Sequence, residues 1–141
     1  YQYYETICSG SPAGDGFKGT DAVQVHMTNS SMTDPEVLEF RYPVLLEEFS
    51  IRNGSGGTGK WSAGNGTKRT VRFLECMGMT ILSSHRTRCP EGLMGGGNGE
   101  MGQTFIRRQD GNLEELQGCD ETQLKAGEAV IIITPTAGGF G

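Results

Sequence analysis

The sequence predicts a mainly β domain, an antiparallel sandwich or partly open barrel, with one short helix near residues 33–41. Short apolar or alternating runs recur between turn-forming residues, which is typical of antiparallel sheets. The 141 residues include 23 glycines without a collagen-like period, so the chain must turn often or bring its backbone close to another group. A chain of this length can bury one core, and we expect a single domain over residues 1–141.

Strands are expected wherever alternating or apolar runs lie between turns. The Val and Ile run at residues 129–134 predicts the most buried strand. Asp110-Gly111 predicts a tight hairpin, because Gly tolerates positive φ. The expected strands cover residues 1–8, 20–27, 49–52, 71–73, 79–82, 104–108, 113–116 and 129–134.

One helix is predicted to begin at residues 33–36, which read Thr-Asp-Pro-Glu and have the form of a capping box. In that motif the Thr33 hydroxyl accepts from the Glu36 N–H, and the Glu36 carboxylate accepts from the Thr33 N–H. Pro43 should end the helix, since the residue before a proline is pushed out of the helical region. We therefore expect the helix to reach about residue 41.

The composition excludes several classes of partner. The formal net charge is −5, and no basic cluster of the kind that binds nucleic acid is present. Lys68, Arg69 and Arg72 form the nearest run, which we interpret as a solvated sheet face. No apolar stretch reaches the roughly 20 residues that span a bilayer. We expect no nucleic-acid partner, no membrane partner and a cytoplasmic location.

Residues 54–60 read Gly-Ser-Gly-Gly-Thr-Gly-Lys and have the spaced glycines and lysine of a phosphate-binding P-loop. Trp61 stands where magnesium binding needs Ser or Thr, and the loop lies between two expected strands when it should open a helix. We therefore predict a glycine-rich connection and no cofactor site here.

A dense set of polar side chains surrounds the expected helix start, and four of them are candidate site residues. We assign catalytic roles to His26 and Asp34, and substrate-binding roles to Asn29 and Arg41. Asn29 and Asp34 also have local explanations, in turn formation and in the helix dipole. A lone histidine without a nearby second His or Cys is a poor metal ligand set, so no metal is predicted in this chain.

The glycine-rich segment at residues 92–99 has two interpretations. It is a wide loop, or its amides form an anion nest beside His85, Arg86 and Arg88. Residues 134–141 could similarly admit a close approach of another backbone or of a ligand. The sequence holds no self-contained catalytic signature, so catalysis by this chain alone has no visible basis.

Several strings occur in the order found at the C-terminal end of hydantoinase B and 5-oxoprolinase proteins, and the chain resembles that family throughout. The strings lie at residues 3–6, 26–29, 33–36, 41–43, 54–57, 92–93, 134–135 and 138–139. Residues 4–14 and 118–120 are similar to the long single-chain oxoprolinases in particular. Since the chain also begins with Tyr1, we expect a C-terminal fragment of a much larger protein.

The resemblance implies an ATP-dependent hydrolase of cyclic amides, which converts 5-oxo-L-proline to L-glutamate. It implies ATP and a divalent cation in the full enzyme, and none in this fragment. The implied partners are hydantoinase A-like and hydantoinase B-like parts of the same protein, in a homo-oligomer. Three alternatives stay open: an N-methylhydantoinase-type amidohydrolase, an ATP-dependent ketone carboxylase subunit, and a purely structural docking domain.

Overall fold

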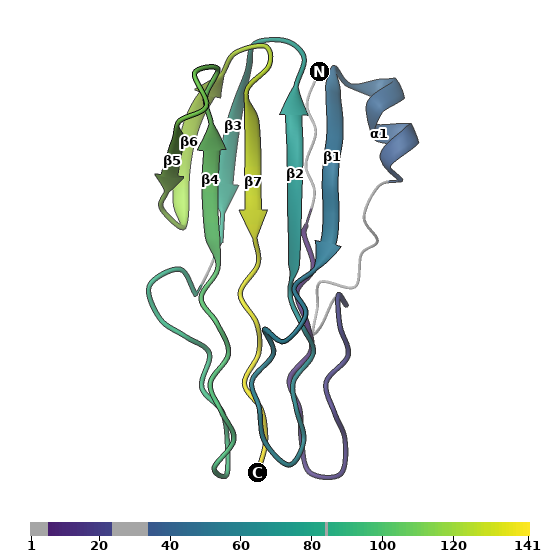
Figure 1. Ribbon diagram of the computed structural model, residues 1–141, viewed down its shortest axis with the longest axis vertical. Helices are drawn as coiled ribbons and strands as arrows, with labels where there is room; N and C mark the ends of the chain where they lie inside the picture. The colour runs from purple at the N-terminus through teal and green to yellow at the C-terminus, as the bar shows by residue number, and fades with distance from the viewer. Residues whose placement is uncertain (1–5, 24–33, 84) are drawn as a thin grey trace.

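The computed structural model describes residues 6–23, 34–83 and 85–141. Five strands of the described chain form one antiparallel sheet in the order β1-β2-β7-β4-β5, while β3 and β6 pair as a separate antiparallel ribbon (Figure 1). The predicted mainly β class with one short helix is confirmed, and the sheet does not close into a barrel. The elements are α1 (Pro35–Arg41), β1 (Val44–Ile51), β2 (Thr67–Phe73), β3 (Met77–Leu82), β4 (Gln103–Arg107), β5 (Leu113–Leu116), β6 (Cys119–Leu124) and β7 (Ala129–Ile133).

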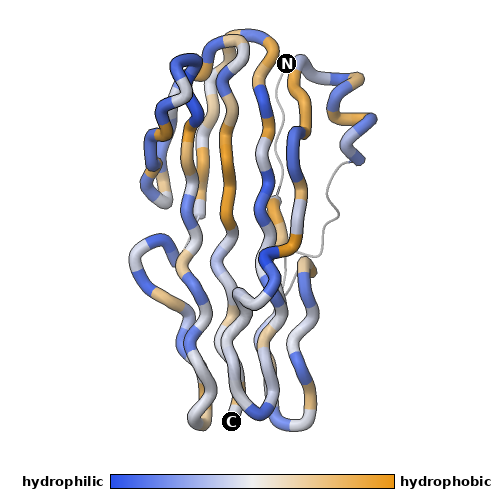
Figure 2. The backbone as a smooth tube through the Cα atoms, in the orientation of Figure 1, coloured by the Kyte–Doolittle hydropathy of each residue, from blue (hydrophilic) through white to orange (hydrophobic). Residues whose placement is uncertain are grey.

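The hydrophobic core lies between one face of the large sheet and a cover formed by α1 and the β3–β6 ribbon. Leu38 of α1 and Leu124 of β6 are at most 2% exposed, and both belong to the cluster that contains Ile106 and Val130 of the sheet. The apolar run of β7 is flanked by β2 and β4 and appears as a continuous orange stretch in the upper half of Figure 2. This is a two-layer arrangement with β7 at the centre of the large sheet. The prediction that this Val and Ile run forms the most buried strand is wrong, because residues 131–133 are only partly buried whereas β2 has four buried residues.

The lower half of the molecule contains almost no regular strand. Residues 8–22, 52–66, 88–102 and 134–141 run there as extended segments, pale in Figure 2, that bond to one another through backbone groups. Their glycines permit this packing: a Cβ on Gly64 would lie 2.0 Å from the Thr20 oxygen. A Cβ on Gly99 would lie equally close, at 2.0 Å, to the Thr136 oxygen. Residues 134–141 therefore approach other backbone, one of the two alternatives expected for them.

The start of α1 differs from the expected capping box. The Glu36 N–H donates to the Asp34 carboxylate at 2.9 Å, so Asp34 is the N-cap and the helix begins at Pro35. An Asx cap is at least as favourable as a Thr cap, and it leaves Pro35 in the first turn, where its missing N–H costs nothing. The helix ends at Arg41, before Pro43, as predicted. It is neither long nor apolar enough to cross a membrane, and it is the only helix among the described residues.

Two strand expectations need correction. The strand β6 was not predicted, because its residues are mostly polar and only Leu124 is buried. In β2, Lys68 and Arg72 lie on the open face and pair with glutamates, but Arg69 is only 3% exposed. A strand alternates its faces, so Arg69 shares the inner face of Val71 and Phe73, and the three basic residues do not form one solvated face.

The predicted strands from residue 49 onward are present, but β1, β2 and β3 begin five, four and two residues before the predicted starts at residues 49, 71 and 79. Residues 113–116 form β5 as expected, and the turn before it has Gly111 at φ 86°. Of the two strands expected at residues 1–8 and 20–27, residues 1–5 and 24–27 lie outside the described residues. The described parts belong to no regular strand, although an isolated bridge joins Ser9 to Val23 at their ends.

Candidate functional site

The four predicted site residues are only partly described by the structure. His26 and Asn29 lie outside the described residues. Asp34 and Arg41 are exposed and occupy opposite ends of α1, separated by roughly 10 Å of helix at 1.5 Å per residue. The described residues thus bring no two of the four together, and the roles assigned to all of them stay predictions.

Several backbone amides of the P-loop-like segment at residues 54–60 donate to other groups of the protein. The Gly56 N–H donates to the Asn65 side chain, the Gly57 N–H to the Ala137 oxygen, and the Lys60 N–H to the Gly141 oxygen. The segment connects β1 to β2 without opening a helix. A nucleotide phosphate needs free amides at a helix start, so this segment does not fit a nucleotide.

The glycine-rich segment at residues 92–99 is likewise engaged. The Gly92 N–H donates to the Asn98 side chain, the Leu93 N–H to the Gly139 oxygen, and the Gly97 N–H to the Thr58 oxygen. Because these amides already have acceptors, they are not available for an anion nest. Of the two interpretations, the structure favours the wide loop. Arg86, which precedes this segment in the sequence, lines a separate cleft.

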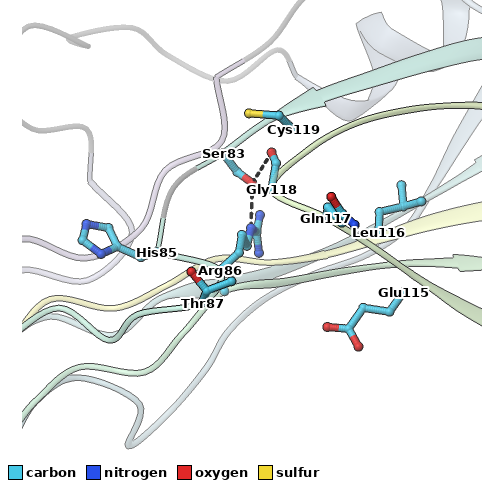
Figure 3. A pocket seen from close by; sticks show the side chains of 10 residues that line it. Ser83, His85, Arg86, Thr87, Glu115, Leu116, Gln117, Gly118 and Cys119 are labelled. Carbon is cyan, nitrogen blue, oxygen red and sulfur yellow. Dashed lines mark hydrogen bonds between the residues drawn. The ribbon is translucent and has the colours of Figure 1, made fainter.

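Arg86 lines a cleft of about 790 Å³ below the lower end of the β3–β6 ribbon (Figure 3). The cleft joins segments that are far apart in the sequence: the chain after β3, the approach to β4, and the β5–β6 turn. Its lining residues are Ser83, His85, Arg86, Thr87, Gly102, Glu115, Leu116, Gln117, Gly118 and Cys119. In the sequence, His85 and Arg86 lie beside the candidate anion nest and residues 118–120 carry part of the family resemblance, but no local pattern predicts that these segments meet in a cleft.

The Arg86 guanidinium is held in place by two hydrogen bonds. Its Nε–H donates to the Ser83 hydroxyl at 2.7 Å, and Nη1 donates to the Ile133 carbonyl at 2.8 Å. Ser83 is fixed in turn, because its hydroxyl donates to the Gly118 carbonyl at 2.9 Å. A long side chain restrained at both ends of its head group loses little further entropy when it binds a ligand.

Two glycines make room for this side chain. A Cβ on Gly102 would lie 2.4 Å from Nη1 of Arg86, and a Cβ on Gly118 would lie 3.1 Å from its Cγ. The chain next to Arg86 is also sharply bent, with His85 at φ 54°, a conformation that non-glycine residues seldom adopt. The His85 carbonyl accepts from the Gly102 N–H at 3.0 Å, which stabilises that bend. The local backbone is thus arranged around the guanidinium.

The charge of Arg86 has no carboxylate partner among the described residues. Burial lowers the pKa of its guanidinium from the ordinary value. A partly desolvated cation without a counter-ion is an arrangement that favours anion binding. No group of three or more His, Cys, Asp or Glu side chains in the described chain could hold a metal ion.

Fold and site together define a mainly β domain with a backbone-packed, glycine-rich end and one arginine-lined cleft. The chain belongs to the hydantoinase B/oxoprolinase family, whose model matches residues 1–141. It is 45% identical over 139 residues to a 5-oxoprolinase of Dictyostelium discoideum, which covers 99% of this chain and 11% of that protein. It is also 45% identical to 5-oxoprolinase 1 of Arabidopsis thaliana, over 100% of this chain and 11% of that protein.

A solved structure shares the fold. The crystal structure of an ATP-dependent caprolactamase from Pseudomonas jessenii superposes with a TM-score of 0.83 at 24% sequence identity. The match covers 96% of this chain and 24% of that chain. The chain thus spans about 11% of the length of the two curated oxoprolinases and about a quarter of the caprolactamase chain.

Proposed function

We propose that this chain is the C-terminal β-rich part of an ATP-dependent 5-oxoprolinase. The full-length protein would convert 5-oxo-L-proline, ATP and water to L-glutamate, ADP and phosphate. The observation that carries the proposal is the 45% identity to two proteins named 5-oxoprolinase, over 99% and 100% of this chain. Because those proteins are about nine times longer, most of the machinery lies outside these residues, and we expect the isolated chain to be inactive.

The proposed reaction has two stages. The amide oxygen takes the γ-phosphoryl group of ATP, and water then attacks the activated carbonyl carbon. The ring C–N bond then breaks to leave an acyl phosphate of the linear amino acid, and a second water hydrolyses this acyl phosphate to L-glutamate and phosphate. The engaged amides of residues 54–60 and 92–99 support the placement of ATP and its divalent cation on a hydantoinase A-like part of the same protein.

Within this chain, we assign His26 and Asp34 to catalysis and Asn29 and Arg41 to the substrate or to the groups that support it. The assignment rests on their residue types: an imidazole and a carboxylate can move protons, while an amide and a guanidinium can orient a polar ring. The further partners we propose are the remaining hydantoinase B-like part, the small cyclic amide, and other copies in a cytoplasmic homo-oligomer.

A second candidate function has one observation in its favour. The solved structure with the same fold is named an ATP-dependent caprolactamase, so a related cyclic amide without a carboxylate is an alternative substrate. Hydantoins belong to the same alternative, whereas an ATP-dependent ketone carboxylase would form a C–C bond to bicarbonate.

The test is an assay of the full-length protein with 5-oxo-L-proline, caprolactam, a hydantoin and a small ketone with bicarbonate, each with and without ATP. ATP-dependent glutamate formation supports the proposal. Turnover of caprolactam or a hydantoin in its place would keep the class of reaction and refute the substrate, and ketone carboxylation would refute both.

A further inference from the structure

We propose that the Arg86 cleft binds a singly charged carboxylate, and that in the full-length protein this is the carboxylate of 5-oxo-L-proline. The identity of the ligand rests on the proposed function, whereas the class of ligand rests on the cleft alone. The sequence motifs place Arg86 only beside a candidate anion nest at residues 92–99, and the relatives described above assign it no role.

The first argument is that the guanidinium is positioned but not fully used. Nε and Nη1 donate to Ser83 and to the Ile133 carbonyl. Among the described residues, nothing accepts a hydrogen bond from Nη2. An arginine that served only to tie the loop to the end of β7 would need the first two bonds alone. The third nitrogen remains as a possible donor to a ligand, and Arg86 lines the cleft (Figure 3).

The second argument is that, in the part of the chain that the structure describes, Arg86 lacks the glutamate partner that four other partly buried arginines have. Each of those pairs with a glutamate, as the high cost of an unpaired buried charge leads one to expect. They are Arg52, Arg72, Arg107 and Arg108. Arg86 is half-buried and has no such partner among the described residues. A bound carboxylate would therefore supply the missing negative charge.

The third argument concerns the charge of the ligand. Arg86 is the one residue of the cleft lining that is always cationic, and Glu115 contributes a carboxylate to the same lining. Glu115 repels any anion, and the repulsion grows with the charge of the ligand, so a polyphosphate is disfavoured more than a monocarboxylate and is only partly neutralised by one guanidinium. A monocarboxylate matches the single cation and its planar geometry, and Thr87 and Gln117 offer neutral polar groups nearby.

The experiment compares two ligands that differ only in the carboxylate. In the full-length protein, KM and the equilibrium Kd from calorimetry are measured for 5-oxo-L-proline and for 2-pyrrolidinone, which has the same ring without the acid. Arg86→Gln should raise both constants for 5-oxo-L-proline by about tenfold or more, since it removes a charge-assisted hydrogen bond. The constants for 2-pyrrolidinone should change by less than about twofold.

Two further variants control for charge and for folding. Arg88 is highly exposed and its only described partner is Glu91 at 3.9 Å, so Arg88→Gln makes the same charge change outside the cleft and should leave both ligands unaffected. Arg86→Lys keeps the charge but loses the fork, and it should weaken 5-oxo-L-proline binding by a smaller factor even if Arg86→Gln does not fold.

The outcomes separate the two proposals. Unchanged constants, or equal losses for both ligands, would overturn the carboxylate site while leaving the proposed function intact. A raised KM for ATP alone would overturn it in favour of a phosphate ligand. Carboxylate binding that depends on Arg86, in a protein without 5-oxoprolinase turnover, would refute the proposed function and retain the site.

Discussion

Two buried or half-buried charges in this domain are stabilised in different ways. The Glu128 carboxylate is 5% exposed and accepts hydrogen bonds from the Lys125 amide, the Gln109 amide and the Arg108 guanidinium. The Lys125 amide, and then Arg108, hold the pKa of Glu128 below its ordinary value, although burial acts to raise it. The charge of Glu128 is thus paired with the Arg108 guanidinium of the same chain, while, among the described residues, the Arg86 guanidinium bonds only to a hydroxyl and a carbonyl.

The first prediction concerns Glu128→Gln. The change removes the charge that three donors stabilise, and we expect local opening around β7 to become easier by about 1–3 kcal/mol at neutral pH. A carboxyl group with a lowered folded pKa stabilises the fold above its unfolded pKa and loses that contribution as the pH falls through the folded value. The difference between wild type and variant should therefore shrink below about pH 4.5.

Hydrogen exchange in the full-length protein, followed at the amides of Gln109 and Lys125 and compared between the two proteins at each pH, measures this effect. Glu121 lies on an exposed strand, so Glu121→Gln is a suitable control and should change little. A constant difference between wild type and Glu128→Gln from pH 7 to pH 3 would contradict the assignment.

The second prediction concerns His26, whose catalytic role is a proposal. His26→Ala in the full-length protein should reduce turnover by more than about tenfold, the usual scale of a lost acid–base group, without lowering the midpoint of thermal unfolding. Near-normal turnover would remove His26 from catalysis. Full activity after the combined change of His26 and Arg41 would favour a structural docking domain.

At the scale of elements, glycine has a different role in each half of the molecule. In the upper half Gly111, at φ 86°, forms a hairpin turn that its Asp-Gly sequence predicts. In the lower half, glycines allow extended segments to touch through their backbones, as at Gly64 and Gly99. The abundance of glycine predicts close approach, but nothing in the local sequence says which segments pair. That pairing is set by long-range contacts.

The third prediction tests this packing. Gly64→Ala would place a Cβ 2.0 Å from the rigid Thr20 oxygen, and we expect it to destabilise the lower half by at least about 2 kcal/mol. Gly78→Ala is the matched control, because the nearest atom, at 3.1 Å, belongs to the flexible Gln123 side chain. Faster hydrogen exchange at Ser11 and Gly19 in the first variant alone is the expected result. Equal behaviour of the two variants would contradict it.

The strands that could be predicted are those whose side chains alternate or are wholly apolar. The Val and Ile run of β7 predicts a strand, and the structure places that strand between β2 and β4. The polar β6 has no such signal, because it is stabilised by pairing with β3 and buries only Leu124. The N-cap of α1 could not be predicted from residue type either. Thr33 and Asp34 both suit the position, and only the structure shows that Asp34 occupies it.

For the whole molecule, the fold class could be predicted from local patterns but the cleft could not. Arg86 is conspicuous in the sequence beside a glycine-rich run, yet the groups that hold it come from the ends of β3 and β7 and from the β5–β6 turn. Local patterns do not specify contacts between residues as distant as Arg86 and Ile133. The residues predicted around His26 form a separate set, which the structure describes only at Asp34 and Arg41.

The chain corresponds to a small part of its longer relatives. The chain covers about 11% of the curated oxoprolinases, and its phosphate-like loops are closed by their own backbone bonds. We therefore expect it to contribute substrate contacts to a site whose nucleotide is held elsewhere.

The most direct test is ATP-dependent release of L-glutamate from 5-oxo-L-proline by the full-length protein, with the isolated 141-residue chain assayed alongside. The account predicts glutamate formation coupled to ADP release by the full-length protein and none by the isolated chain. A full-length protein that forms no glutamate from 5-oxo-L-proline, or an isolated chain that forms it unaided, would contradict the account.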